Sequence, residues 1–188
     1  MNILDRSSTA LVLIDLQEGI LAMPTAPRAS SEVLASAKAL AQRFRAAQAP
    51  VILVRVAFAS NFADAPSMRV DQPPAWPEGG LPLQWSELAG GLHEPGDIVI
   101  TKRQWGAFTG TELDLQLRRR GIRSIVIGGI ATNFGVESTV RHAWELGYDS
   151  LVVEDICTSL SAELHATAIR HILPRIARIV SSDQIEIQ

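Results

Sequence analysis

GGIATNFGVESTVRHAWELGY, residues 128–148, joins an apolar segment to an amphipathic one through a turn of small and polar residues. The segment before the turn, SIVIGGI at 124–130, is short and rich in β-branched residues, which is typical of a strand covered on both faces. After the turn, apolar residues recur at helical spacing as far as Gly147, which is well placed to end a helix. Residues 132–135 fall in the first turn, where free backbone N–H groups can bind an anion or a developing oxyanion. The stretch therefore predicts a strand, an elbow and a helix, with chemistry at the elbow.

The composition indicates one domain over residues 1–188 and argues against two classes of partner. With 188 residues, 47% of them hydrophobic, the chain can bury one good core. Its net charge of -3 and the lack of a basic face argue against nucleic acid and membrane surfaces, and we expect the basic run 118–120 to be a solvated helix end. No signal peptide or membrane span fits the first residues, and the single cysteine, Cys157, suits a reducing compartment. We expect a cytoplasmic protein with a small-molecule substrate.

Strand and helix patterns alternate along the chain. The expected strands are 10–14, 50–57, 97–101, 124–130, 150–153 and 177–180. The expected helices are 31–47, 112–120, the one after the elbow, and 161–172, with a short polar tail at the end. This alternation predicts an α/β fold of three layers, a doubly wound and mostly parallel sheet with helices on both faces. In such sheets ligands bind beyond the carboxyl ends of the strands.

Charged side chains directly follow two of these apolar strands. Asp15 ends the run ALVLI, and Lys102 follows DIVIT. A helix N-cap is the plain alternative for Asp15, and a surface lysine is the alternative for Lys102. Because each residue lies at the mouth of a strand, we expect both to meet Gly135 of the elbow at one edge of the sheet. A carboxylate beside an ammonium group can move protons there.

The region between the second and third strands has an unusual composition. Residues 60–96 hold six of the ten prolines and two tryptophans, Trp76 and Trp85, and predict a lid, a specificity loop or a subunit contact. Arg55, near the end of the second strand, is either a substrate-binding cation or a solvated edge residue.

These motifs together resemble the isochorismatase-like hydrolase family. The resemblance rests on IDLQ at 14–17, on TKRQWGAF at 101–108 followed by Gly110-Thr111, and on the elbow, and it covers nearly the whole chain. It implies an isochorismatase-like, Rossmann-like topology. The family includes amidohydrolases with an Asp-Lys-Cys triad and isochorismatases proper, which cleave a vinyl ether without a cysteine nucleophile. Carried over, the resemblance makes Asp15 and Lys102 catalytic and puts Gly135 at the nucleophile position, so this chain departs from the amidase pattern.

The resemblance implies further details of the site. Ala131 and Gly135 belong to the nucleophile and oxyanion region, and the Ile130–Ala131 peptide is expected to be cis. Substrate-binding roles are expected for Gln17, Arg55, Gln104, Trp105, Phe108, Thr132, Asn133 and Phe134. Homo-oligomers are usual in the family. No metal is expected, because VRVAFASNFAD after the second strand has no histidine; no cofactor is expected either, and the histidines show no metal-ligand spacing.

Three functions stay open at this level. In the first, Asp15 protonates the vinyl group of an enolpyruvyl ether and water completes the cleavage. In the second, Asp15 acts as general base for water attack on an amide, which is slow without a covalent nucleophile. In the third, the chain binds a ligand or assembles without catalysis. We interpret Cys157 as a buried packing residue, and the protonation of Asp15 depends on burial, which raises its pKa, against Lys102, which lowers it.

Overall fold

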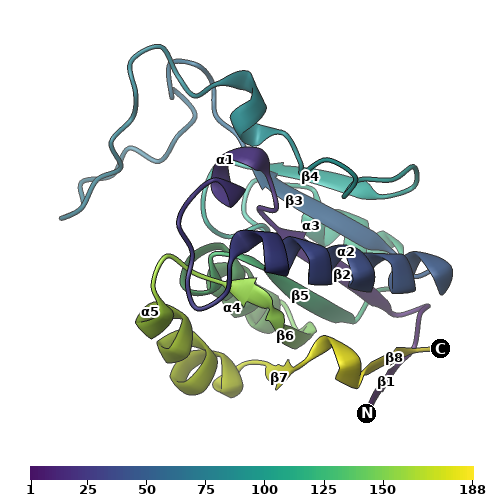
Figure 1. Cartoon of the computed structure of the whole chain (residues 1–188). Coiled ribbons are helices and arrows are strands. Elements are labelled where there is room, and N and C mark those ends of the chain that lie inside the picture. Colours follow the sequence, from purple (N-terminus) through teal and green to yellow (C-terminus); the bar gives the residue numbers. More distant parts are fainter.

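The computed structural model describes residues 1–188, whose main feature is a six-stranded parallel sheet (Figure 1). Its order is β4-β3-β2-β5-β6-β7, and every neighbouring pair is parallel. The strands are β2 (Thr9–Ile14), β3 (Val51–Val56), β4 (Ile98–Lys102), β5 (Ser124–Ile130), β6 (Asp149–Thr158) and β7 (Arg178–Val180). The chain winds outward from β2 to one edge and from β5 to the other, so the strand order reverses between β2 and β5. This is the Rossmann-like order predicted from the sequence.

Helices cover both faces of this sheet and confirm the three-layer prediction (Figure 1). On one face lies α2 (Ser30–Ala46), which buries Val33, Ala37, Leu40, Ala41 and Phe44 at helical spacing. On the other face α3 (Leu113–Arg119) and α4 (Glu137–Glu145) share one core with the helical segment that follows α5 (Ala162–Thr167). The remaining short helix is α1 (Glu18–Leu21). No helix combines the length and the apolar character that a membrane crossing requires.

The two ends of the chain form a second sheet that the sequence did not predict. The tail expected to be merely polar contains β8 (Ile185–Ile187), which pairs in parallel with β1 (Asn2–Leu4), and the termini lie together (Figure 1). Strands of three residues carry too little periodicity to be recognised, and their pairing joins opposite ends of the chain. A second correction concerns β6, which continues past the predicted 150–153 to Thr158, so that Cys157 lies within the strand.

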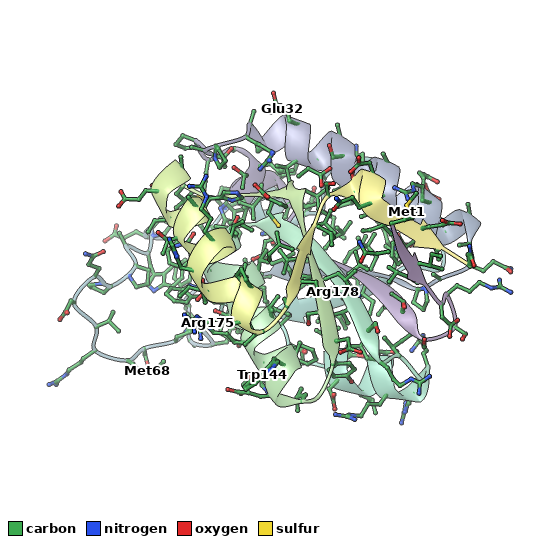
Figure 2. The ribbon with its side chains drawn as sticks, turned by 90° about the horizontal axis from the view of Figure 1, so that it is seen from below. Met1, Glu32, Met68, Trp144, Arg175 and Arg178 are labelled. Atoms are coloured by element: carbon green, nitrogen blue, oxygen red, sulfur yellow. The ribbon has the colours of Figure 1, made fainter.

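The segment between β3 and β4 has no strand of its own and only one short 3₁₀ turn, Leu83–Ser86. Figure 1 shows it extending away from the sheet, and Figure 2 places Met68 toward its outer end. At its base the Trp76 ring packs on Phe58 and Phe62, at centroid distances of 5.0 and 4.5 Å. These aromatic contacts support this part of the segment, and an antiparallel bridge between Gln17 and Leu88 ties its later part to the chain after β2.

The elbow has the predicted order of strand, turn and helix. Its first turn, Thr132–Val136, is a π-helical turn that leads into α4. Gly129, at the end of β5, has φ of 133°, and a Cβ on it would lie 2.1 Å from the carbonyl oxygen of Ile14. Only glycine lets β5 approach the end of β2 this closely. That approach brings the elbow beside the residue that follows β2.

Candidate active site

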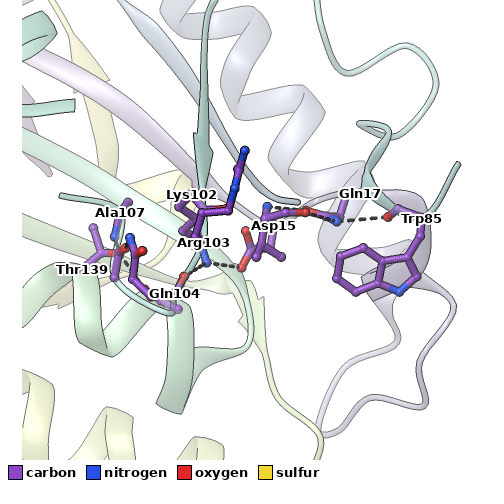
Figure 3. Close-up of polar contacts among 11 residues, drawn as sticks. Asp15, Gln17, Trp85, Lys102, Arg103, Gln104, Ala107 and Thr139 are labelled. Carbon is purple, nitrogen blue, oxygen red and sulfur yellow. Dashed lines mark hydrogen bonds and ion pairs between the residues drawn. The ribbon is translucent and has the colours of Figure 1, made fainter. Parts of the chain in front are cut away.

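Asp15 and Lys102 form a buried ion pair at the carboxyl ends of β2 and β4 (Figure 3). Lys102 Nζ lies 2.7 Å from Asp15 Oδ2 and 3.1 Å from the carbonyl oxygen of Gln104. Asp15 is 6% exposed and Lys102 is 2% exposed. β3 lies between the two strands, so the long lysine side chain spans its end to reach the carboxylate. Two residues that are 87 positions apart in the chain thus share one site.

Asp15 combines an uncommon backbone with an unusual carboxyl group. Its φ is 52°, a left-handed conformation that few residues other than glycine adopt. Its Oδ1 is buried and has no hydrogen-bond partner, whereas Oδ2 accepts from Lys102. Burial raises the pKa of Asp15 to about 6, against the charge and hydrogen bond of Lys102, which lower it. The effect of burial on the pKa of Asp15 is therefore larger than the opposite effect of Lys102, a balance that the sequence left open. As a result the carboxyl group can change protonation near neutral pH.

Gly135 lies directly beside this pair. A Cβ at Gly135 would be 3.2 Å from Asp15 Oδ2 and 3.6 Å from Lys102 Nζ. It would also be 2.9 Å from Ile14 Cγ2, which is closer than such carbons normally approach. The three positions expected to converge do so, and the space at residue 135 is too tight for an added side chain without a shift of Ile14.

A cavity of about 1230 Å³ opens over these residues. Of the residues predicted to contact substrate, Gln104, Trp105 and Phe134 line it together with Ala131. The rings of Trp105 and Phe134 lie 4.7 Å apart between centroids. Much of the remaining wall comes from the proline-rich segment, including Met68, Val70, Trp76 and Trp85. This segment therefore contributes to the site. Of the three interpretations of its sequence, the lid and the specificity loop both expected this position.

Three of the predicted substrate-binding residues do not line the cavity, because their side chains have other partners. Gln17 is fully buried, accepts from Val56 N–H at 2.8 Å, and donates to the carbonyl oxygens of Val56 and Trp85 at 3.0 Å each (Figure 3). Arg55 donates to Thr101 Oγ1 and to the Ser86 carbonyl oxygen. Phe108 is 5% exposed and belongs to the core under α3 and α4. Of the three, Gln17 contacts two residues of the cavity lining, Val56 and Trp85.

Thr132 and Asn133 also lie outside the cavity. Their side chains bind residues that follow β5 in the chain, at the end of β6 and in α5. Thr132 Oγ1 donates to the Thr158 carbonyl oxygen at 3.0 Å and lies 2.8 Å from His165 Nδ1. Asn133 Oδ1 accepts from the Ser159 hydroxyl. His165, from α5, is buried, which lowers its pKa. Sequence reasoning missed this contact, since nothing in the spacing of a single histidine shows that it will meet a threonine 33 residues earlier.

Cys157 lies outside the cavity, fully buried in β6. Burial raises the pKa of its thiol to about 12, so the thiolate is scarce at neutral pH. The interpretation of Cys157 as a packing residue is confirmed. No three His, Cys, Asp or Glu side chains come together in a way that could hold a metal ion.

Comparison with known proteins agrees with this geometry. The model of the isochorismatase domain matches residues 9–184. The chain belongs to the isochorismatase family. It is 51% identical over 183 residues to the isochorismatase family protein YecD of Escherichia coli O157:H7, covering 97% of this chain and 96% of that protein. It is 43% identical over 182 residues to YwoC of Bacillus subtilis strain 168, covering 96% and 94%.

A solved isochorismatase family structure from Burkholderia thailandensis is similar throughout. It superposes with a TM-score of 0.91 at 43% identity, covering 95% of this chain and 94% of that one. The fold, with Asp15, Lys102 and the elbow at the carboxyl edge of its sheet, is thus the isochorismatase-family hydrolase fold. The cis Ile130–Ala131 peptide expected from the family resemblance is confirmed as well.

Proposed function

We propose that this member of the isochorismatase family is a small-molecule hydrolase that works without a thiol nucleophile. Asp15 acts as general acid on an enolpyruvyl (vinyl) ether. The observation that carries the proposal is the carboxyl group of Asp15, whose pKa is raised to about 6, whose Oδ1 has no hydrogen-bond partner and whose Oδ2 lies beside Gly135. A group that gives and retakes a proton works best when its pKa lies near the working pH.

The reaction consumes one water, and Asp15 lends a proton that it regains by the end of the cycle. Protonated Asp15 transfers its proton to the terminal methylene carbon of the vinyl ether, and the double-bond electrons form the new C–H bond. This leaves an oxocarbenium ion and an Asp15 carboxylate. Water adds to the cationic carbon and gives a proton to Asp15, which produces a hemiketal. Transfer of that proton to the ether oxygen breaks the C–O bond and releases the alcohol. The hemiketal hydroxyl gives its own proton to the Asp15 carboxylate as the carbonyl group of pyruvate forms, so Asp15 ends protonated, as it began.

Lys102 and Gly135 have separate roles in this scheme. Lys102 holds Oδ2 of Asp15, so the proton is exchanged through Oδ1, and its charge stabilises the carboxylate formed after the first step. Because residue 135 is glycine, no side chain at this position shields the Asp15 carboxyl group from the reacting carbon. The scheme needs no thiol, which fits a glycine at this position and a buried Cys157.

The test uses α-phenoxyacrylate, the enolpyruvyl ether of phenol, with pyruvate release as the signal. We expect turnover by the wild type and a loss of about 100-fold or more in Asp15→Asn, since general acid catalysis contributes about this much. Asp149→Asn is the matched control, because Asp149 is exposed, lies outside the cavity and takes no part in the ion pair. Equal rates in wild type and Asp15→Asn contradict the proposal.

A second candidate follows from the same pKa. Above pH 6 the Asp15 carboxyl is ionised, and it can then act as general base for water attack on an amide. For this route the elbow offers fewer donors than its sequence suggested, since the N–H groups of Phe134 and Val136 already donate to the Ala131 carbonyl oxygen. A purely ligand-binding protein is the remaining alternative, and it predicts no turnover of either substrate.

Several sequence expectations stay predictions. Self-association of the chain can be measured by sedimentation, and exposed Trp144 on α4 is one apolar group available for it (Figure 2). The cytoplasmic location and the absence of a metal or cofactor likewise rest on the sequence alone.

A further inference from the structure

The wall of the cavity is predominantly aromatic and aliphatic. Five aromatic rings line it, from three different parts of the chain: Phe58, Trp76, Trp85, Trp105 and Phe134. Aliphatic and thioether side chains, such as Met23, Val56 and Leu160, fill the spaces between them. Flat apolar surfaces of this kind bind a flat apolar group by stacking and by exclusion of water.

The charges that face the cavity are already balanced. Its four charged side chains are Asp15, Asp71, Lys102 and Arg103, two of each sign. Lys102 is paired with Asp15, and Arg103 Nε lies 2.5 Å from Asp64 Oδ2. Each cation already has a carboxylate partner, and Asp71, which has no cation partner, adds a negative charge that repels additional carboxylates on a ligand. Placing an unpaired anion among aromatic side chains is unfavourable because the anion loses its water.

The Trp85 ring is held in place by a close contact with Gly19, called its seat below. A Cβ on Gly19 would lie 2.0 Å from Trp85 Cδ1 and 2.2 Å from Nε1, so the indole rests directly on the backbone of Gly19. The Trp85 carbonyl oxygen accepts from Gln17 Nε2 (Figure 3). The Gln17 side chain also forms hydrogen bonds with the backbone N–H and carbonyl groups of Val56. Gly19 and Gln17 therefore set the position of the Trp85 ring relative to the end of β3.

We infer that the substrate carries a flat apolar ring and no more than one carboxylate, and that Trp85, seated on Gly19, is a specificity-determining residue that packs on this ring. The inference rests on the proposed function, because it concerns the same cavity. The proposed function states which bond is cleaved, the vinyl ether. The present inference states which group that bond carries, a flat apolar ring.

Binding can be measured separately from turnover. Three of the four tryptophans, Trp76, Trp85 and Trp105, line the cavity, so ligand binding should change the intrinsic fluorescence. The ligand is α-phenoxypropanoate, a saturated ether that has no vinyl group to protonate. We expect it to bind about tenfold or more tightly than α-methoxypropanoate, which lacks the ring, and than its own meta-carboxylated derivative, which carries a second charge. Equal or tighter binding of the dianion, or of the ligand without a ring, overturns the inference.

Two variants test the seat of Trp85. Gly19→Ala should displace the ring and weaken α-phenoxypropanoate binding about tenfold, with little change for α-methoxypropanoate. Gly90→Ala is the matched control, because its Cβ would have no atom within 4 Å and it lies outside the cavity. Trp85→Leu should give the same selective loss if Gly19→Ala does not fold. Unchanged binding in a folded Gly19→Ala or Trp85→Leu protein contradicts the role of Trp85.

The outcomes for the two proposals are distinguishable. If the wild type binds α-phenoxypropanoate selectively but does not hydrolyse α-phenoxyacrylate, the ring preference stands and the vinyl-ether reaction is wrong. If it hydrolyses α-phenoxyacrylate and the meta-carboxylated derivative with equal kcat/KM, the reaction stands and the charge limit is wrong.

Discussion

Lys102 Nζ lies 2.7 Å from Oδ2 of Asp15, and both side chains are almost completely removed from water. Burying two charges is unfavourable unless they pair well, and here one oxygen of the carboxylate is paired while the other is free. The pair therefore holds a proton-exchanging group in a defined orientation.

The pH dependence of activity separates the two chemical routes. With Asp15 as general acid, kcat/KM should be highest below pH 5 and fall about tenfold per pH unit above its pKa of about 6. With Asp15 as general base, kcat/KM should instead rise through pH 6 and level off. A profile that is flat between pH 5 and pH 8 leaves Asp15 without either role.

The pH dependence of stability reports the same group in the absence of substrate. The folded-state pKa of Asp15, about 6, is raised above its ordinary value of 3.8, so its contribution to stability is fully present below pH 4 and is lost as the pH rises through 6. The free energy of unfolding should fall over this window by up to about 3 kcal/mol. Urea unfolding at a series of pH values measures this, and Asp15→Asn should lack that part of the slope.

Lys102→Met removes the cation that lowers the pKa of Asp15. The pKa should move above 6, and the falling limb of the pH profile should move to higher pH. Stability should drop most at pH 8, by about 3 to 5 kcal/mol, since there the carboxylate is left charged and unpaired. Lys38→Met is the control, because Lys38 is the only other lysine and its Nζ binds the Gly90 carbonyl oxygen at the surface. An unshifted profile shows that Lys102 does not act on Asp15.

Gly135→Ala places a methyl group 2.9 Å from Ile14 Cγ2 and 3.2 Å from Asp15 Oδ2. We expect a loss of about 1 to 3 kcal/mol in stability from overpacking and a fall in kcat, since the methyl group occupies the space of the reacting carbon. Thermal unfolding and pyruvate release measure the two effects, with Gly90→Ala as the control glycine. The same crowding should lower the stability of Gly135→Cys. In a folded Gly135→Cys protein the new thiol should react with iodoacetamide faster than the buried Cys157 of the wild type. No such labelling in a folded variant means that residue 135 is closed off from solvent.

Cys157 should take no part in the chemistry. Its thiol is fully buried and has a pKa of about 12, so iodoacetamide should neither label nor inhibit the native protein at pH 7. Cys157→Ala should keep its kcat and lose about 1 to 2 kcal/mol of stability through lost packing. Inhibition by iodoacetamide that disappears in Cys157→Ala contradicts this prediction.

Several features of the fold follow directly from local patterns in the chain. The run before Asp15 is apolar because β2 is a central strand that is buried along its whole length, whereas the run before Lys102 belongs to the edge strand β4, which leaves Val99 exposed. The elbow is recognisable because a strand pattern changes to a helical pattern across a few small residues. The convergence of Asp15, Lys102 and Gly135 then follows from parallel topology, which brings the carboxyl ends of strands to one edge.

The sequence alone determined the layered α/β fold, the edge at which the site lies and the residue types that meet there, since periodicity and strand order are local or topological properties. Only the tertiary structure decided that burial outweighs Lys102 in setting the pKa of Asp15, that Gln17, Arg55 and Phe108 do not line the cavity, and that Trp85 rests on Gly19. The physical reason is that desolvation, hydrogen-bond partners and close contacts depend on distances of a few ångströms between residues far apart in the chain. Such distances are set when the whole core packs, and no single segment contains them.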